Sequence, residues 1–368
     1  MTDRQLVVDA RQWNDTGIGT HLRLAMQGLV DAAVDRVVAV VRRGDVGEPG
    51  LPANLVVSRV DSAYLPPVDA RRRLSRRSIA TWWIPHYAIY RAPAGRLVST
   101  VHDLIHLEDP SGLLPPWKRT YARGQLRRVA RLADAVITPS NATAARLVAR
   151  HPALDGRVHV IPNGIDPGWA LARPHPRAAR EQRVVYVGTS NPHKDLPTAL
   201  EAAGLLAERD LTPEWMFVTA SPWRDPRLPD AIDRARRRGA HVTFTDAPVP
   251  TAVLVDLVSR SLLSVHPSLQ EGFGLTLAEA MSVGTPPVAS RIDAHCEVAA
   301  DGATWFAPGS ATELAQHVEH LLRDANAWRL AGVAAQERGA ILDAGAMQRS
   351  MVSLLLDPAE PGARADSP

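Results

Sequence analysis

Two glutamates flank a glycine-rich turn in the most distinctive stretch of the sequence. Glu271 precedes the run Gly272-Phe273-Gly274-Leu275, and Glu279 lies in the apolar segment that follows. Two glycines let a backbone turn sharply and approach a ligand closely, and the free N–H groups of a helix that begins there attract an anion. The carboxylates can accept hydrogen bonds from sugar hydroxyls or a ribose diol. The plainer alternative is a strand–turn–helix corner with two solvated glutamates.

A lysine stands at a second predicted strand-to-helix turn. Gly188 and Thr189 follow the apolar run 185–187, and Lys194 comes shortly before the next predicted helix. An ammonium group at such a turn can neutralise a departing diphosphate. Apart from Lys118, it is the only lysine in a chain whose other strongly basic residues are all Arg. This bias favours a specific role for Lys194 over a solvated surface lysine.

The first half of the chain holds two further candidate sites. Gly17 and Gly19 follow the first predicted strand, where a tight turn explains them equally well, because a dinucleotide fingerprint would need glycine in place of Leu22. His102 and Asp103 end another predicted strand. We expect the imidazole to contact a sugar or an acceptor, and the carboxylate to orient it.

Short β-branched runs alternate with amphipathic segments through most of the chain, which predicts βαβ units and parallel sheets covered on both faces. The predicted strands are 6–10, 36–41, 55–60, 97–102, 135–138, 158–161, 183–187, 216–219, 242–245, 263–266, 287–290 and 304–306. Proline and arginine over 166–182 indicate a linker. We therefore predict two doubly wound Rossmann-like domains facing a cleft. The first spans 1–165 with a C-terminal helix near 341–357, the second spans 166–340, and 358–368 form a flexible tail.

Composition excludes several classes of protein. The 368 residues are 45% hydrophobic and 22% charged, which is typical of globular domains, and a formal charge of +3 is too small to indicate a nucleic-acid partner. The single Cys296 permits no intramolecular disulfide and fits a reducing cytoplasm. No run approaches the roughly 20 apolar residues of a membrane span, and no signal peptide is evident, so we expect a cytoplasmic protein.

The run from Glu271 to Glu279 resembles the E-x7-E signature of retaining glycosyltransferases of family 4, which have the two-domain GT-B fold. The resemblance implies that Glu271 contacts the donor sugar, that the amides of 272–275 hold the diphosphate, and that Glu279 binds the ribose. It extends along nearly the whole chain: Gly188, Thr189 and Lys194 match the family's phosphate loop. Gly17 and Gly19 match the family's glycine loop, and His102 and Asp103 match its His-Asp motif. Residues 161–166 match its hinge turn, and Val249 matches the backbone that holds the nucleotide base.

One departure from the family pattern concerns the diphosphate. The family usually places an Arg beside the glycine or the lysine of the phosphate loop, whereas this chain has Thr189 and His193 there. One positive charge is therefore missing or supplied from elsewhere. A metal is not expected to supply it, because no Asp-x-Asp pair occurs and His102, His106 and Glu108 lack a further ligand at helical spacing. We expect no cofactor and no metal, with Lys194 and the helix N-terminus acting on the diphosphate.

The resemblance implies a retaining hexosyltransferase that moves a sugar from a nucleoside-diphosphate donor to an acceptor hydroxyl and forms an α-glycosidic bond. GDP-mannose is the favoured donor, with UDP- and dTDP-sugars left open. The acceptor is a saccharide, a lipid-linked glycan or a small metabolite. The alternatives are a non-catalytic or epimerase-type sugar-nucleotide protein and, in another class, a nicotinamide-dependent enzyme, which the broken glycine fingerprint disfavours.

An arginine-rich stretch, 71–77, precedes Trp82 and Trp83. Basic residues beside aromatic ones suit a peripheral contact with the inner face of a membrane or a phosphorylated acceptor. The plainer alternative, which we favour, is an exposed helix face that leads to core tryptophans.

Overall fold

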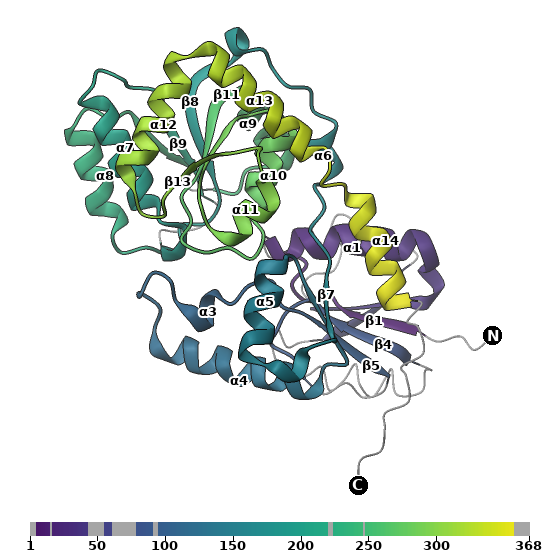
Figure 1. Ribbon diagram of the computed structural model, residues 1–368. Coiled ribbons are helices and arrows are strands. Elements are labelled where there is room, and N and C mark those ends of the chain that lie inside the picture. Colours follow the sequence, from purple (N-terminus) through teal and green to yellow (C-terminus); the bar gives the residue numbers. More distant parts are fainter. Residues whose placement is uncertain are drawn as a thin grey trace.

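Two parallel sheets, each covered by helices, form the framework of the molecule (Figure 1). The computed structural model describes residues 5–14, 17–42, 55–60, 79–90, 95–219, 224–245 and 247–356. The first sheet has the strand order β3-β2-β1-β4-β5-β6-β7, and the second has the order β10-β9-β8-β11-β12-β13. In both sheets the order reverses beside the first strand of the unit, and ligands of such sheets bind at this reversal beyond the carboxyl ends of the strands. The predicted two-domain α/β architecture is confirmed.

The strands agree with the predicted ones to within a few residues at each end, with one addition. They are β1 (Gln5–Asp9), β2 (Val37–Arg42), β3 (Val56–Val60), β4 (Ile79–Ile84), β5 (Arg96–Thr100), β6 (Ala135–Thr138), β7 (Val158–Val160), β8 (Glu181–Val187), β9 (Glu214–Val218), β10 (Val242–Thr245), β11 (Ser261–His266), β12 (Pro287–Ser290) and β13 (Thr304–Phe306). The predicted boundary between residues 165 and 166 falls between β7 and β8 and stays a prediction.

Helices follow most strands and cover both faces of each sheet (Figure 1). They are α1 (Gly17–Ala33), α3 (Ile105–Glu108), α4 (Pro116–Leu132), α5 (Asn141–Arg150), α6 (Pro167–Ala170), α7 (Leu196–Ala207), α8 (Leu228–Arg237), α9 (Thr251–Arg260), α10 (Leu275–Ser282), α11 (Asp293–Ala299), α12 (Ala311–Arg323), α13 (Ala325–Gly339) and α14 (Ala344–Leu356). Among these described helices, none combines the length and the apolar character that crossing a bilayer requires.

Strand β4 was not predicted from the sequence, and it carries the two tryptophans that were expected in the core. Trp82 and Trp83 are fully buried, as expected, but they lie on this strand and pack on opposite faces of the first sheet. The Trp82 indole donates to the Tyr90 hydroxyl and the Trp83 indole donates to Thr100 Oγ1, each at 3.0 Å. A strand buried on both faces shows no polar–apolar alternation, which explains why the pattern missed it. The stretch 71–77 lies outside the described residues, as does the tail 358–368.

The C-terminal segment returns to the first sheet, as predicted, and helix α14 lies within the predicted range 341–357. Residues 340–343 separate α13 from α14, and Ile165 pairs with Asp343 there. Helix α14 then packs against α1 (Figure 1), where Gln348 Nε2 donates to the Leu24 carbonyl at 3.1 Å. Gly164 lies against Ala344, so the two chain crossings between the sheets run side by side.

Candidate active site

The loop between β11 and α10 carries the first glutamate of the signature and reaches the first domain. A Cβ atom added to Gly272 would lie 1.7 Å from the His102 carbonyl oxygen, so only glycine permits this approach. The Gly272 carbonyl in turn accepts hydrogen bonds from Ser140 Oγ at 2.7 Å and Thr143 Oγ1 at 3.3 Å. The glycine loop and the His-Asp strand end, predicted separately from the sequence, therefore meet.

Helix α10 begins directly after this loop with its first N–H groups open to a ligand. Gly274 occupies the position before the helix with φ at 97°, a conformation that favours glycine, and no side chain caps the helix start. The amides of the first turn, beginning at Leu275, carry partial positive charge because the peptide dipoles of the helix align. Phe273 is buried and anchors the loop in the core. This end of α10 is suited to an anion such as a diphosphate.

Lys194 and Glu271 form an ion pair beside the helix start. The lysine follows β8 in a short 3₁₀ turn, Pro192–Lys194, and its Nζ lies 2.5 Å from Glu271 Oε1. Ser268 Oγ donates to the same carboxylate oxygen at 2.6 Å. Burial alone would raise the pKa of Glu271, but the adjacent Lys194 ammonium lowers it to about 2, so the carboxylate is ionised at neutral pH. The pair places one cation and one anion beside the open start of α10.

Thr189 and His193 stand where the family pattern usually has an arginine, in the same loop as Lys194. Burial, followed by the nearby Lys194 charge, lowers the pKa of His193 to about 4, so its ring is neutral at pH 7 and does not replace a guanidinium. Thr189 presents a buried hydroxyl oxygen that has no hydrogen-bond partner among the described residues. A buried hydroxyl without a partner is unfavourable unless a ligand completes it. The Thr189 hydroxyl is thus one unused hydrogen-bonding group in the loop from Gly188 to Lys194.

Glu279 lies in a separate pocket of about 210 Å³ on the second domain. The walls are mostly apolar, with His266, Ser264 and Thr276 as polar members. Burial, together with the negative charge of Asp166, raises the pKa of Glu279 to about 8. Its carboxyl group has no hydrogen bond to the described residues. A nearly buried carboxyl group without a partner, at the side of a pocket, is suited to a vicinal diol.

His102 is oriented by the backbone rather than by Asp103. Its Nε2 lies 2.8 Å from the Pro85 carbonyl, which can only accept, so Nε2 carries the proton and Nδ1 is left as an acceptor. Burial lowers the pKa of His102, which keeps the ring neutral. Asp103 accepts from the Ile105 amide at 3.0 Å and starts α3. The expectation that Asp103 orients the ring is therefore not met among the described hydrogen bonds.

His21 is a neighbour of His102 that the sequence did not indicate. The two rings meet edge to face with centroids 4.9 Å apart, and His21 Nδ1 lies 2.8 Å from Asn163 Oδ1 in the hinge turn. Its Nε2 is buried and has no partner in the described part of the chain. Burial and the His102 ring lower the pKa of His21 to about 3, so it is neutral. His21 follows the glycine loop inside α1, where a single histidine belongs to no chemical pattern that the sequence shows.

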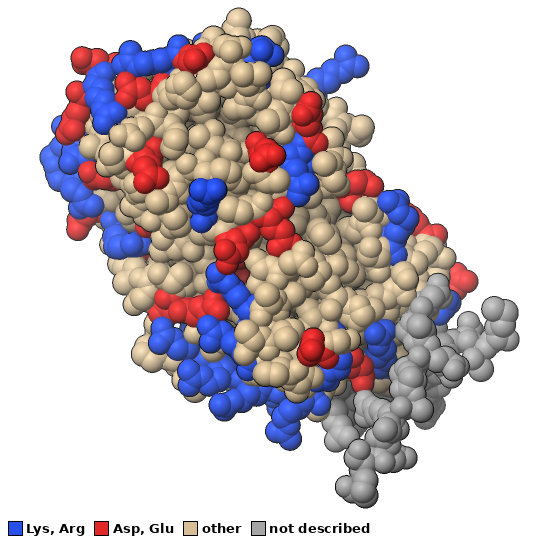
Figure 2. Space-filling view, in the orientation of Figure 1, with Lys and Arg blue, Asp and Glu red and all other residues tan. Residues whose placement is uncertain are grey.

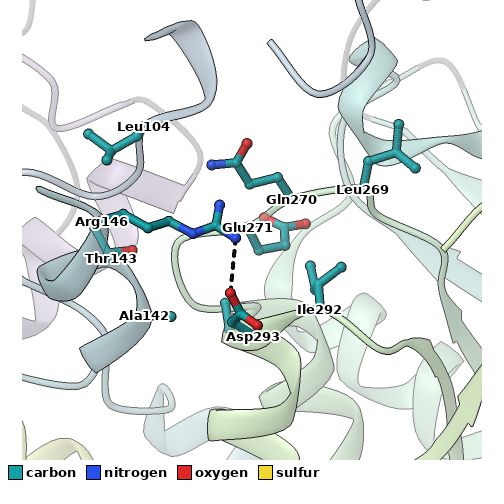
Figure 3. Close-up of a pocket in the computed structure, with 10 residues that line it drawn as sticks. Leu104, Ala142, Thr143, Arg146, Leu269, Gln270, Glu271, Ile292 and Asp293 are labelled. Atoms are coloured by element: carbon teal, nitrogen blue, oxygen red, sulfur yellow. Dashed lines mark hydrogen bonds and ion pairs between the residues drawn. The ribbon is translucent and has the colours of Figure 1, made fainter. Parts of the chain in front are cut away.

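A cleft of about 300 Å³ opens between the domains beside Glu271 (Figure 3). Its lining comes from both domains: Leu104, Ala142, Thr143 and Arg146 from the first, and Leu269, Gln270, Glu271, Ile292, Asp293 and Ala294 from the second. Arg146 points across it, with Nη2 3.0 Å from Asp293 and Nη1 3.0 Å from Glu108. Gln270 Nε2 donates to the same Glu108 at 2.5 Å.

A second contact between the domains lies at the start of α5. The Glu297 carboxylate accepts from the Asn141 amide at 2.7 Å and from the Ala142 amide at 2.9 Å, so it caps a helix of the other domain. A carboxylate at a helix N-terminus is favourable because of the helix dipole. The residues that make these contacts between the domains are spread along the sequence from Glu108 to Glu297. They form no sequence motif, so only the folded structure identifies them.

The remaining predicted residues are three glycines at the ends of helices or strands and one partly buried valine. Gly17 begins α1, and a Cβ on Gly19 would lie 2.5 Å from the Trp13 carbonyl. Gly188 directly follows β8, and its amide donates to the Val218 carbonyl; Val249 packs at the edge of the second-domain core. Within the described part, no three His, Cys, Asp or Glu side chains gather in a way that could hold a metal.

Two family models match consecutive parts of the chain. The model described as Glycosyltransferase Family 4 matches residues 16–169, and the model described as Glycosyl transferases group 1 matches residues 169–338. The second match contains the loop 188–194 and both glutamates of the signature, and the first contains His102 and Asp103. The two matches meet at residue 169, in the segment that joins the two sheets.

Individual relatives agree with these matches. The chain is 28% identical over 310 residues to an alpha-maltose-1-phosphate synthase of Mycolicibacterium smegmatis, covering 75% of this chain and 79% of the relative. It is 31% identical to an MMP alpha-(1->4)-mannosyltransferase of Mycolicibacterium hassiacum over 47% of this chain and 40% of that protein. Among solved structures, the sucrose-phosphate synthase of Thermosynechococcus elongatus superimposes with a TM-score of 0.75 at 19% identity, covering 95% of this chain and 98% of that one.

Proposed function

This chain belongs to the group 1, family 4 glycosyltransferases of GT-B fold, which act on nucleotide sugars, and we propose that it is a retaining, metal-independent hexosyltransferase. GDP-mannose is the proposed donor, and the product is an α-glycoside of an acceptor hydroxyl. The observation that carries the proposal is the placement of Lys194 Nζ against Glu271 at the open N-terminus of α10. The mannosyltransferase among the relatives supports mannose as the sugar and the α-linkage.

Departure of the diphosphate is the step that these residues assist. As the bond between the anomeric carbon and the phosphate oxygen breaks, negative charge develops on the diphosphate. The Lys194 ammonium and the amides of the first turn of α10 stabilise that charge without reorganising. One preorganised donor of this kind is worth about 10²–10³ in turnover.

Bond formation completes the step on the same face of the sugar. The acceptor oxygen bonds to the anomeric carbon as the diphosphate leaves, and its proton passes to a diphosphate oxygen, so that the configuration is retained. Glu271 is ionised and paired, which suits it to hold the donor sugar through its hydroxyls rather than to act as an acid. The unprotonated Nδ1 of His102 is available to accept a hydrogen bond from the donor sugar or from the acceptor hydroxyl.

The nucleoside is proposed to occupy the pocket beside Glu279. Its carboxyl group can take two hydrogen bonds from the ribose diol, and the apolar walls, which include Trp169 and Val187, exclude water from them. The acceptor, whether a saccharide, a lipid-linked glycan or a small metabolite, enters between the domains. Closure is supported by the contacts of Gly272, Arg146 and Glu297 across the cleft.

A second candidate, a sugar-nucleotide binder without turnover, is favoured by one observation only. His193 is neutral and supplies no charge where the family usually has arginine. Incubating the protein with GDP-mannose, UDP-glucose and dTDP-glucose in EDTA, with a panel of sugar acceptors, separates the two. Release of the nucleoside diphosphate together with a new anomeric proton signal of α-configuration supports the enzyme. Binding without release supports the binder, and a β-configured product overturns retention.

A further inference from the structure

One exposed surface of the first domain combines aromatic rings with arginines, and the proposed reaction does not use it. It consists of Leu113 and the outer face of α4, and we call it the α4 surface. Its side chains are Leu113, Trp117, Tyr121, Arg127, Arg128 and Arg131. Leu113, Trp117 and Tyr121 are 42%, 64% and 45% exposed, which is high for side chains of this size.

The helical period separates this surface from the core. Ala122, Leu126 and Val129 follow one another at helical spacing and are buried against the first sheet. Trp117, Tyr121 and the arginines therefore lie on the opposite, solvent-facing side. The packing of the domain is already satisfied by the inner face, so it gives no reason for two aromatic rings outside.

The charge of the helix has a single sign. Its sequence from Pro116 to Leu132 contains no acidic residue. Arg127, Arg128 and Arg131 are exposed and form no ion pair with any described residue, whereas Arg119 is paired with Asp109 at 3.2 Å. In Figure 2 blue side chains gather along the lower edge of the molecule, where Figure 1 places α4. Such an unbalanced positive strip attracts a polyanionic surface.

The aromatic end of α4 lies next to the proposed active site. Tyr87 accepts or donates a hydrogen bond at 2.7 Å to His106 Nδ1, on the helix that follows Asp103. Helix α3 packs against α4, and Leu104, directly before α3, lines the cleft between the domains. A partner seated on the α4 surface would therefore lie beside the mouth of the cleft.

We propose that the α4 surface docks the protein on an anionic lipid bilayer. Trp and Tyr prefer the headgroup level of a membrane, where the ring is apolar and its N–H or O–H group stays wet, and arginines are attracted by anionic headgroups. Trp117 with Tyr121 and the Arg127–Arg131 cluster supply the two contributions along one helix. This docking uses no residue of the donor site, so it is independent of the proposed reaction.

The test is cosedimentation of the full chain with vesicles of phosphatidylglycerol and phosphatidylcholine, compared with phosphatidylcholine alone. The test variant is Arg127→Gln/Arg128→Gln/Arg131→Gln, and the matched control is Arg234→Gln/Arg236→Gln/Arg237→Gln. The control removes the same charge from the exposed face of α8 in the second domain, which carries no aromatic residue. Because each arginine near an anionic surface contributes about a fivefold factor, the test variant should bind about 100-fold more weakly. The control should bind within about threefold of the wild type.

Insertion of the aromatic end is tested separately by fluorescence. Brominated anionic lipids should quench the wild type more than Trp117→Phe, because Trp117 reaches the headgroup region. Equal binding to zwitterionic vesicles, equal losses in the two arginine variants, or equal quenching would each overturn the proposal. Binding to a short DNA duplex that the α4 variant loses, without binding to anionic vesicles, would instead assign the surface to nucleic acid. Circular dichroism and melting of each variant establish that it is folded.

Discussion

The carboxyl group of Glu279 should make the stability of the protein fall with rising pH, and Glu279→Gln should remove this effect. In the folded protein its pKa is raised to about 8 by burial and the charge of Asp166, whereas the ordinary value is 4.5. Below pH 4.5 the group is protonated in both the folded and unfolded states, so its contribution to stability is fully present. Between pH 4.5 and about pH 8 only the unfolded chain releases this proton, so the free energy of unfolding falls steadily as the pH rises. Above the folded pKa both states are ionised and the decline ends.

The magnitude follows from the size of the shift. Each unit of pKa difference corresponds to about 1.4 kcal/mol, so the loss over the whole window is roughly 5 kcal/mol. The residue is 9% exposed, and solvent screening therefore reduces this figure little. Glutamine has nearly the same shape and no charge, so the variant should show no such decline. Glu337→Gln, at an exposed position of α13, serves as the control and should behave like the wild type.

Two assays check this prediction. Urea unfolding at several pH values between 4 and 9 should give curves for the wild type and Glu279→Gln that diverge steadily as pH rises. In carbon NMR of glutamate-labelled protein, one carboxyl signal should titrate near pH 8 and be absent from the variant. Adding GDP should lower that pKa, because ribose hydroxyls favour the ionised carboxylate. Parallel stability curves, or no signal that titrates above pH 6, would refute the account of this pocket.

Three substitutions test the rest of the site. Lys194→Ala should lower turnover at least 100-fold, because the positive charge that stabilises the leaving diphosphate is lost, whereas Lys194→Arg should keep part of the activity. Steady-state rates with excess donor measure this, and turnover of Lys194→Ala like that of the wild type would exclude the role. Gly272→Ala should also lower turnover at least 100-fold, because its Cβ would lie 1.7 Å from a carbonyl oxygen of the first domain, but the nucleotide should still raise its melting temperature. Gly124→Ala, where nothing lies within 4 Å of the added Cβ, is the control. Equal rates of the two variants would contradict the close contact between the Gly272 loop and the first domain. His193→Arg should tighten GDP binding about tenfold in calorimetry by adding a charge-assisted contact, and unchanged affinity would mean that the diphosphate does not reach this position.

Much of the fold was predictable because its signals are local. The runs before Gly188 and before the Glu271 loop are short, β-branched and followed by turns, so their strands were predicted to within two residues at each end. Both sheets are parallel, as the alternation of strands and helices requires. Strand β4 escaped prediction because Trp82 and Trp83 are buried on opposite faces, which gives a continuous apolar run without a period.

The site was predictable only where chemistry and motif coincide. Glu271, Glu279 and Lys194 stood out by their spacing around glycines and by the scarcity of lysine. His21 and Glu297 gave no such signal, because their role depends on which helix end or ring they meet after folding. The orientation of His102 by the Pro85 carbonyl is likewise a property of the tertiary structure, set by a contact between two strand ends.

The central claim is that Lys194 and the start of α10 bind a nucleoside diphosphate without a metal. A thermal-shift panel of GDP, UDP, dTDP and ADP, each with Mg²⁺ and with EDTA, tests it most directly, with Lys194→Ala as the comparison. At about 100 times its dissociation constant a ligand adds roughly 2.7 kcal/mol of stability, which is a readily visible shift. The account predicts a shift with GDP that is equal in Mg²⁺ and EDTA and reduced in the variant. A shift that requires Mg²⁺, or no shift with any of the four nucleotides, would contradict it.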